Sequence, residues 1–398
     1  MYFNTEDECT LIAKKFEDST LDSAQCKQGY YQVGRKLFNK KFNALLEASV
    51  THQPVIWNFN QEVFAKQARM SRLDVPLLEL YKQRALQLRD KYDYLILAYS
   101  GGADSDNILK VFQQNKIHLD EVWCDWPSSL VEKSNYVISN RINPENMPVE
   151  WFCVVKPALD ELAITNPEIF IHVSDAFERQ TLEDAEDSMT VVSAPQVYTS
   201  IKRYRYITQY MKKFEDRGQR IAVVMGIDKV SPTRRGNQYG FKFNDNATFF
   251  KTRAQGNEYC NVEYFYWTPD FPAIVTEQAH LVWDRLLLYP VDTQAKLDLK
   301  GLEWQQRKKG FDHTINKICY PHWDFNKIQV DKSNVFFNNH FDTLTQQFQK
   351  ERFYQSWASC ARNAIGQLDP AIAFNDKTSI KSEMVTFFNF HSIGTIPW

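Results

Sequence analysis

The feature that most constrains this chain is a short apolar run followed at once by a glycine-containing turn. Tyr94–Ala98 reads Tyr-Leu-Ile-Leu-Ala, and residues 100–105 read Ser-Gly-Gly-Ala-Asp-Ser. A continuous apolar run of this length, ended by a turn, is typical of a strand that is buried on both faces. Apolar residues recur at helical spacing after the turn, so Ser105–Gln114 is predicted to be a helix. A buried strand that leads directly into a helix indicates the first half of a βαβ unit.

Strands and helices continue to alternate along the chain. Further strands are predicted at Leu119–Cys124, Trp151–Val155 and Arg220–Met225, and helices at Pro157–Thr165 and Val197–Phe214. This alternation predicts an open, mostly parallel sheet, which places the chain in the α/β class.

The chain is expected to have three regions: the alternating strands and helices, one region before them and one after them. They are a helical N-terminal region over residues 1–88, a nucleotide-binding domain over 89–270, and a mainly helical, aromatic-rich α+β region over 271–398 that begins with a helix at Ala273–Leu288. Within the second region, Gln238–Phe250 and Tyr259–Tyr266 alternate and are aromatic. They predict a hairpin or a lid.

Composition excludes several classes of protein. The 47 basic and 49 acidic residues leave a formal charge of −2, so no global charge favours nucleic acid or an anionic membrane as a partner. Seven cysteines are scattered without a Cys-x-x-Cys pair, which favours reduced thiols. No targeting segment and no apolar run of membrane-spanning length is recognised. The expectation is a cytoplasmic protein without a membrane partner, and an oligomer is compatible with the sequence.

The turn at 100–105 has the chemistry of a phosphate-binding loop. Gly101 and Gly102 permit positive φ and close approach of a ligand to the backbone. Successive N–H groups and the N-terminus of the following helix attract anions. Ser100 and Ser105 add hydroxyl donors, whereas Asp104 places an acid where a phosphate is expected. A Mg²⁺ ion between the Asp104 carboxylate and the phosphate would explain the acid.

The motif Ser-Gly-Gly-x-Asp-Ser after a hydrophobic strand resembles the signature of the PP-loop, or N-type ATP pyrophosphatase, superfamily. Its members include asparagine synthetase and PAPS reductase, and the chain is also similar to PP-loop proteins of tailed phages. The resemblance implies a Rossmann-like sheet of the adenine nucleotide alpha hydrolase type. It also implies ATP binding, with cleavage between the α and β phosphates. Ser100, Gly101, Gly102, Asp104 and Ser105 match the signature and would hold the pyrophosphate, with Mg²⁺ on Asp104.

A second candidate segment, Met-Gly-Ile-Asp-Lys at 225–229, follows another buried strand. Ligands of open α/β sheets bind at the carboxyl ends of the strands, so Gly226 is expected near the nucleotide. Asp228 is a candidate ligand of Mg²⁺ or of the substrate, and Lys229 is a candidate phosphate contact. The alternative is a strand-ending turn with a solvated Asp–Lys pair.

Two weaker candidates complete the site. Arg234 and Arg235, followed by Lys242, are candidates for a mobile clamp over the phosphates, and the alternative is a solvated loop. Asp125 follows the second strand, where the resemblance implies that the adenosine is read. Its side chain is equally compatible with a turn former.

Several motifs of individual superfamily members are missing from this sequence, and their absence limits the reactions that the resemblance implies. The C-terminus lacks the Glu-Cys-Gly motif of PAPS reductase, and Tyr2 stands where asparagine synthetase has its cysteine nucleophile. What remains is an AMP-forming ligase. It would adenylate a carbonyl or carboxylate oxygen, release pyrophosphate and transfer the activated group to an amine.

The substrate, a small molecule or part of a nucleic acid, is not identified by the sequence. Two alternatives stay open. One is a sulfonucleotide reductase that uses Cys360, and the other is a nucleotide-binding protein without catalysis.

Overall fold

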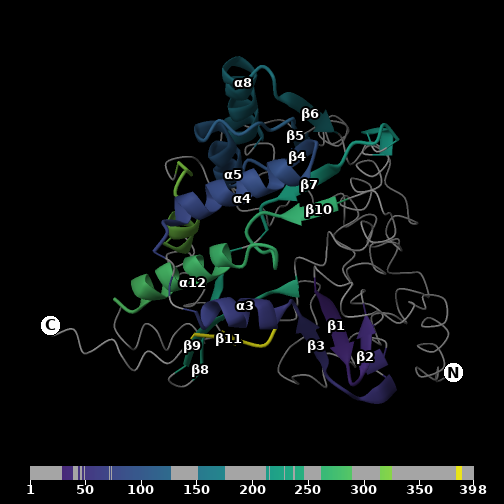
Figure 1. Ribbon diagram of the computed structural model, residues 1–398, viewed down its shortest axis with the longest axis vertical. Coiled ribbons are helices and arrows are strands. Elements are labelled where there is room, and N and C mark those ends of the chain that lie inside the picture. The colour runs from purple at the N-terminus through teal and green to yellow at the C-terminus, as the bar shows by residue number, and fades with distance from the viewer. Residues whose placement is uncertain are drawn as a thin grey trace, which may run out of the picture.

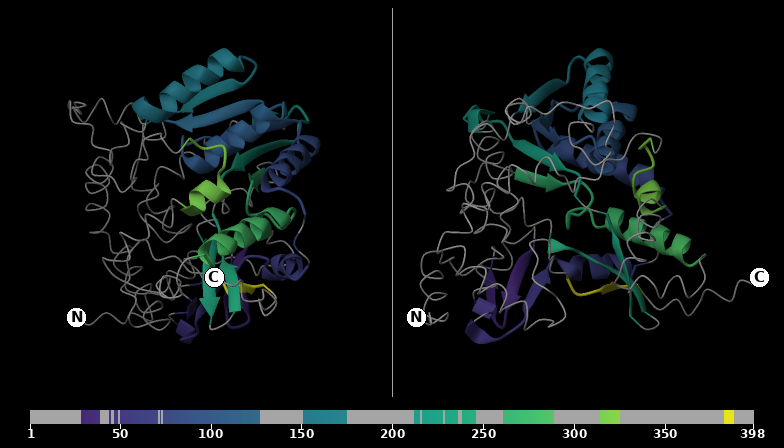
Figure 2. Two further views of the ribbon diagram at one scale, coloured as in Figure 1. Left: turned by 90° about the vertical axis from the view of Figure 1, so that its left-hand side faces the viewer. Right: turned by 180° about the vertical axis from the view of Figure 1, so that it is seen from behind.

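The computed structural model describes residues 29–38, 44, 47–48, 50–70, 72, 74–126, 151–174, 212–214, 216–227, 229–235, 238–245, 261–288, 314–324 and 382–387. These residues form one five-stranded sheet and two three-stranded sheets with helices packed around them (Figure 1). The views in Figures 1 and 2 agree that the five-stranded sheet lies toward one end of the molecule and the two smaller sheets toward the other.

The large sheet is entirely parallel. Its strands are β4 (Tyr94–Ala98), β5 (Glu121–Asp125), β6 (Phe170–Ser174), β7 (Ile221–Met225) and β10 (Asn261–Tyr264). Their order across the sheet is β10-β7-β4-β5-β6, and each neighbouring pair is parallel. All five residues of β7 are buried, as expected for a strand that is covered on both faces. The predicted α/β class and parallel sheet are therefore confirmed.

Helices connect and cover these strands. The longest described helices are α3 (Gln61–Ala68), α4 (Leu77–Lys91), α5 (Ala103–Gln114), α8 (Lys156–Thr165) and α12 (Ala273–Leu286). Helix α5 follows β4 after a four-residue loop and buries its apolar face, as its periodicity predicts. Helix α4 contacts both α5 and β4. The expected boundary between residues 88 and 89 therefore cuts a helix that packs with the parallel sheet.

The N-terminal region contains strands that the sequence did not indicate. β1 (Tyr30–Val33), β2 (Lys36–Phe38) and β3 (Val55–Asn58) form an antiparallel sheet. The helical expectation for residues 1–88 holds for α3 and α4 but is wrong for these strands. Strands of three or four residues are too short to show a clear period, and cross-strand packing stabilises them instead. Tyr31 and Trp57 face each other across β1 and β3, with ring centroids 4.8 Å apart.

A third sheet combines distant parts of the chain. β8 (Ser231–Arg235) and β9 (Gln238–Lys242) form a hairpin, and β11 (Val385–Thr386) pairs with β9. The expected hairpin at Gln238–Phe250 is thus present as β9, although its partner is the preceding segment. Tyr259–Tyr266, expected as a hairpin or lid, instead supplies β10 of the parallel sheet.

One predicted strand is a helical turn. Trp151–Val155 is a π-helical turn that continues into α8, and the strand of this unit is β6. A short apolar run does not distinguish a buried strand from a buried helix, and here α8 begins directly after the run, with Pro157 in its first turn. Of the predicted helix Val197–Phe214, only 212–214 are described, and they are helical.

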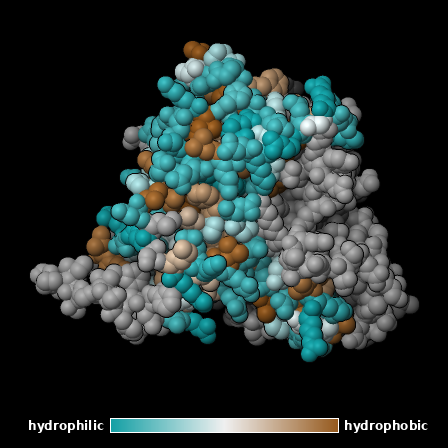
Figure 3. All heavy atoms as spheres, viewed as in Figure 1, coloured by the Kyte–Doolittle hydropathy of each residue, from teal (hydrophilic) through white to brown (hydrophobic). Residues whose placement is uncertain are grey.

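The surface of the described part is mostly hydrophilic on the face drawn in Figure 3, with scattered apolar residues. None of the described helices combines the length and the apolar character that a membrane span requires.

Candidate phosphate-binding site

The loop at 100–105 lies where the order of the parallel strands reverses. From β4 the chain runs to β5 and β6 on one side of the sheet, and later to β7 and β10 on the other. The connections that leave β4 and β7 therefore start at the same carboxyl edge and diverge. In open α/β sheets, this divergence opens a crevice in which ligands bind.

Gly101 has a backbone that favours glycine for two reasons. Its φ of +72° lies in the left-handed region. A Cβ at this position would also lie 2.5 Å from Cγ2 of Val155, the last residue of the π-helical turn. By contrast, Gly102 has a φ of −77° and is the N-cap of α5. Both glycines permit positive φ, and of the two only Gly101 adopts it.

The turn that carries Val155 is held at the same edge of the sheet by aromatic stacking. Trp151 stacks on Trp126, which follows β5, with ring centroids 4.8 Å apart and an interplanar angle of 9°. Trp126 and the π-helical turn therefore position Val155 beside Gly101.

The two serine hydroxyls bond within the loop. Oγ of the buried Ser105 accepts from the backbone N–H of Ser100 and donates to the carbonyl of Gly102, both at 3.2 Å. The Ser100 hydroxyl lies 3.4 Å from Ser105 Oγ and accepts from the Gly102 N–H at 3.4 Å. Both hydroxyls were predicted to be phosphate donors. In this structure both hydroxyls form hydrogen bonds within the loop. Ser105 Oγ uses its acceptor and its donor there.

The helix N-terminus provides the anion-attracting element. The first bond of the α5 ladder runs from Asp106 N to the Gly102 carbonyl at 3.0 Å. The N–H groups of Ala103, Asp104 and Ser105 therefore precede the ladder, at the positive end of the helix dipole. Asp104 lies in this first turn and is partly exposed.

Gly226, which follows β7, lies directly against Asp104. A Cβ on Gly226 would be 3.2 Å from the carbonyl carbon, the Cβ and Oδ2 of Asp104. The two loops that were expected to face each other are thus in contact at this point. Lys229 is partly buried three residues further on, and Asp228 lies outside the described residues.

The backbones of the two arginines belong to a different sheet from the strand that leads into the loop. Arg234 and Arg235 are at the end of β8, opposite Tyr239 and Gln238. This hairpin belongs to the third sheet and lies below the parallel sheet in Figure 1. Arg235 is exposed, and the side chain of Arg234 lies outside the described part.

The remaining sequence candidates have less defined positions. Asp125 is the last residue of β5, at the carboxyl edge and opposite Ser174, but its side chain is outside the described part. Cys360 lies outside the described residues.

Buried polar residues behind the loop were not predicted. Tyr99 donates to Asp106 Oδ1 at 3.0 Å, and Lys110 Nζ is 2.8 Å from Asp106 Oδ2. Burial, together with the nearby Asp106 carboxylate, raises the pKa of Tyr99 well above its usual value, so the phenol remains a donor. The sequence offered a weak signal, because Asp106 and Asn107 are polar residues directly before the apolar positions of a predicted helix.

A metal ion at this site would have few protein ligands. The described residues contain no group of three or more His, Cys, Asp and Glu side chains that could hold a metal. Mg²⁺ needs no such group, because it commonly takes one or two carboxylates together with phosphate oxygens and water. Asp104 supplies one carboxylate, and because residue 226 is glycine, no side chain from that position lies against its Oδ2. The residues present thus fit a phosphate-bound Mg²⁺.

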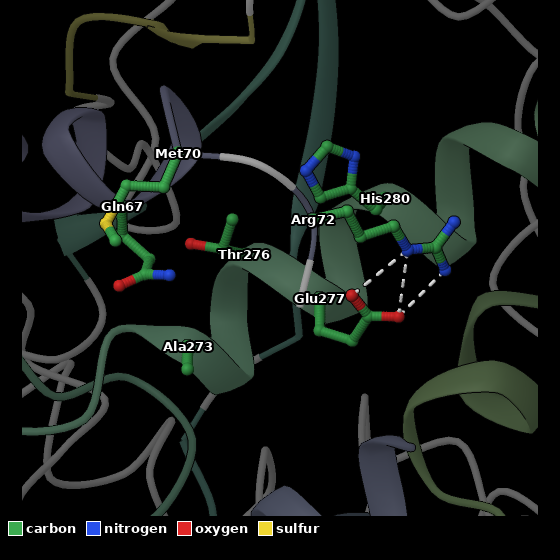
Figure 4. Close-up of a pocket in the computed structure, with 7 residues that line it drawn as sticks. All are labelled: Gln67, Met70, Arg72, Ala273, Thr276, Glu277 and His280. Carbon is green, nitrogen blue, oxygen red and sulfur yellow. Dashed lines mark hydrogen bonds and ion pairs between the residues drawn. The ribbon is translucent and has the colours of Figure 1, made fainter. Parts of the chain in front are cut away.

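A small pocket elsewhere is a poorer candidate for a ligand site. It lies between α3 and α12 and is lined by Gln67, Met70, Arg72, Ala273, Thr276, Glu277 and His280 (Figure 4). Arg72 and Glu277, the principal charged groups of its lining, already pair with each other at 2.8 Å.

Comparison with known proteins finds no family model, no curated protein and no solved structure that matches this chain.

Proposed function

We propose that this protein is an ATP pyrophosphatase of the PP-loop type, which binds the pyrophosphate of ATP at residues 100–105 and forms AMP. One observation carries the proposal. The Ser-Gly-Gly-x-Asp-Ser sequence forms a loop with a left-handed Gly101 at the carboxyl end of the central strand β4, and Gly226 closes against its Asp104. The proposal includes a Rossmann-like arrangement of the adenine nucleotide alpha hydrolase type for the parallel sheet.

The loop would bind the pyrophosphate mainly through its backbone. The N–H groups of Ala103, Asp104 and Ser105 precede the α5 ladder, so they and the helix dipole favour negative charge at this position. Because Ser105 and Ser100 brace the loop, these donors are positioned before ATP arrives. Donors that are already in place stabilise the charge that develops on the departing pyrophosphate without further reorganisation.

Asp104 would hold Mg²⁺ on the phosphates, and Asp228 and Lys229 remain the second candidates for metal and phosphate contacts. A bound Mg²⁺ would supply neutralisation of phosphate charge. The role of Asp104 is to hold that charge beside the helix N-terminus, where its own carboxylate would otherwise repel a phosphate.

The chemistry proposed is adenylation followed by transfer. An oxygen of the substrate carbonyl or carboxylate attacks the α-phosphorus in line. The bond from the α-phosphorus to the α–β bridging oxygen breaks, and its electron pair leaves with pyrophosphate. An amine or ammonia then attacks the activated carbon and loses a proton to solvent, while AMP departs with the C–O bonding pair. The contribution of the loop to the first step is orientation and charge stabilisation.

The product of ATP turnover tests the proposal. The protein is incubated with Mg²⁺, ATP and a small-molecule cell extract, and AMP, ADP and pyrophosphate are separated. We expect AMP and pyrophosphate from the wild type and from Asp216→Ala, whose aspartate is an exposed residue of another turn. We expect neither from Asp104→Ala. ADP as the product, or AMP formation that persists in Asp104→Ala, would contradict the proposal. Bound ATP that stays intact would favour a nucleotide-binding protein without catalysis.

A further inference from the structure

The carbonyl of Asp104 has a partner from a distant part of the chain. The hydroxyl of Tyr266, two residues beyond the end of β10, donates to this carbonyl at 2.9 Å. The same hydroxyl oxygen accepts from Nδ2 of Asn107 on α5, also at 2.9 Å. Tyr266 and Asn107 are both fully buried.

The proton positions in this group follow from the chemistry of its members. Oδ1 of Asn107 accepts from the backbone N–H of His322 at 3.2 Å, and a backbone N–H can only donate. This contact fixes which end of the Asn107 amide is oxygen, so its NH₂ group faces Tyr266. The Tyr266 oxygen therefore accepts from Asn107, and its own proton points to the Asp104 carbonyl, which can only accept.

The bond to the Asp104 carbonyl controls the direction of an N–H group in the loop. A peptide unit is planar, so the carbonyl of Asp104 and the N–H of Ser105 lie in one plane and point in opposite directions. The Ser105 N–H is one of the three that precede the α5 ladder. A donor that holds the Asp104 carbonyl therefore also fixes the direction of the Ser105 N–H at the helix N-terminus.

We propose that Tyr266 is a positioning residue for the phosphate-binding loop, which acts through the Asp104 carbonyl and is itself oriented by Asn107. The identity of the ligand as ATP rests on the proposed function, but the positioning of the loop does not. Burial raises the pKa of Tyr266 well above its usual value.

Asn107 is in turn held by the backbone of His322. Besides the bond from His322 N–H to Asn107, Lys110 of α5 donates to the His322 carbonyl at 3.0 Å. His322 therefore contacts the first two turns of α5 through both of its backbone polar groups. The loop geometry is consequently supported by residues that follow the parallel sheet in the sequence.

The chain offers a closely matched control tyrosine. Tyr81 of α4 is also fully buried, and its ring packs edge-on against Tyr266 with centroids 5.4 Å apart. Its hydroxyl donates to one backbone carbonyl, that of Cys319, at 2.5 Å and accepts from one side-chain amide, that of Gln278, at 2.7 Å. Replacing either tyrosine with phenylalanine thus removes one bond to a backbone carbonyl and one from a side-chain amide. The carbonyl that Tyr266 binds belongs to the loop, and the carbonyl that Tyr81 binds belongs to Cys319.

The experiment compares Tyr266→Phe with Tyr81→Phe by three measurements. Urea unfolding measures stability, hydrogen exchange of residues 99–112 measures loop order without ligand, and calorimetric titration measures affinity for Mg-ATP. We expect similar losses of stability in both variants, because each loses two buried hydrogen bonds. We expect faster exchange and a fall in Mg-ATP affinity of roughly tenfold, the effect of about one hydrogen bond, only in Tyr266→Phe.

The possible outcomes separate the two claims. Equal exchange and equal affinity in the two variants would overturn the positioning role, because Tyr266 would then be merely structural. Faster loop exchange in Tyr266→Phe, with no ATP binding even by the wild type, would support the positioning role and contradict the proposed function. If Tyr266→Phe does not fold, Asn107→Ala gives the same comparison, with a smaller expected change in the same direction.

Discussion

Gly226 and Asp104 are in contact although 122 positions separate them in the sequence (226 − 104), and the space that a Cβ on Gly226 would occupy lies 3.2 Å from Asp104 Oδ2. The contact joins the two loops that leave β4 and β7, where the strand order reverses. A side chain at 226 would press on the carboxylate that we propose holds Mg²⁺. This relationship makes the site testable without touching any of its polar groups.

Replacing Gly226 with alanine is expected to weaken Mg-ATP binding with little effect on stability. The backbone of Gly226 lies outside the left-handed region, so alanine adds no backbone strain there. We expect the contact with Asp104 to be relieved by a shift of a few tenths of an ångström, at a cost below about 1 kcal/mol. Calorimetric titration and urea unfolding measure the two effects.

Gly218→Ala is the matched control. Gly218 has a φ of +75° and open space around it, so this variant should lose stability and keep its affinity. Unchanged Mg-ATP affinity in Gly226→Ala would remove the carboxyl end of β7 from the proposed site.

Gly101→Ala should destabilise the protein through both backbone strain and a clash. The left-handed conformation costs alanine about 1–2 kcal/mol, and the contact of 2.5 Å with Val155 adds to this cost. In the double variant with Val155→Ala, the clash is relieved but the strain remains. We therefore expect the two substitutions to cost less together than the sum of the single costs, as measured by urea unfolding. Additive losses would show that Val155 does not press on residue 101.

The buried ion pair between Arg84 and Glu263 should be the most sensitive point between α4 and the sheet. Arg84 Nη2 lies 2.9 Å from Glu263 Oε2, and Lys91 Nζ lies 2.7 Å from the other oxygen. Glu263→Gln leaves the buried Arg84 without its counter-charge, which is expected to cost about 3–5 kcal/mol of unfolding free energy. Asp216→Asn, at an exposed pair with Lys212, should cost well under about 1 kcal/mol. Equal losses in the two variants would contradict the buried placement of Arg84.

The pair of Asp93 and Arg220 predicts a defined pH dependence. Hydrogen bonds from the side chain and backbone of Arg220 lower the pKa of Asp93 from 3.8 to about 2. A carboxyl with a lowered pKa in the folded state adds stability above its unfolded pKa and loses it as the pH falls toward the folded value. The stability advantage of the wild type over Asp93→Asn should therefore be complete above about pH 4 and shrink toward pH 2. Urea midpoints of both proteins between pH 6 and pH 2.5 measure this difference. A difference that stays constant over this range would refute the lowered pKa of Asp93.

The sequence predicted the part of the site that consists of residues close together in the chain. The apolar run of β4, the turn at 100–105 and the apolar face of α5 are contiguous, so their periodicity and glycines carried enough information to place them. The same rules failed at Trp151–Val155 and at β1, β2 and β3. In these segments an apolar or aromatic stretch of three to five residues is compatible with either structure, and packing decides between them.

The sequence by itself therefore determined the α/β class and the strand-to-helix turn that contains Ser-Gly-Gly-Ala-Asp-Ser. Only the tertiary structure decided the strand order, the contact of Gly226 with Asp104, and the bond from Tyr266 to the Asp104 carbonyl. It also placed Arg234 and Arg235 in the third sheet, whereas the loop follows β4 of the parallel sheet. The physical reason is that helix and strand formation depend on residues a few positions apart. Sheet order and buried hydrogen bonds depend instead on which distant surfaces bury one another, and no local pattern records that choice.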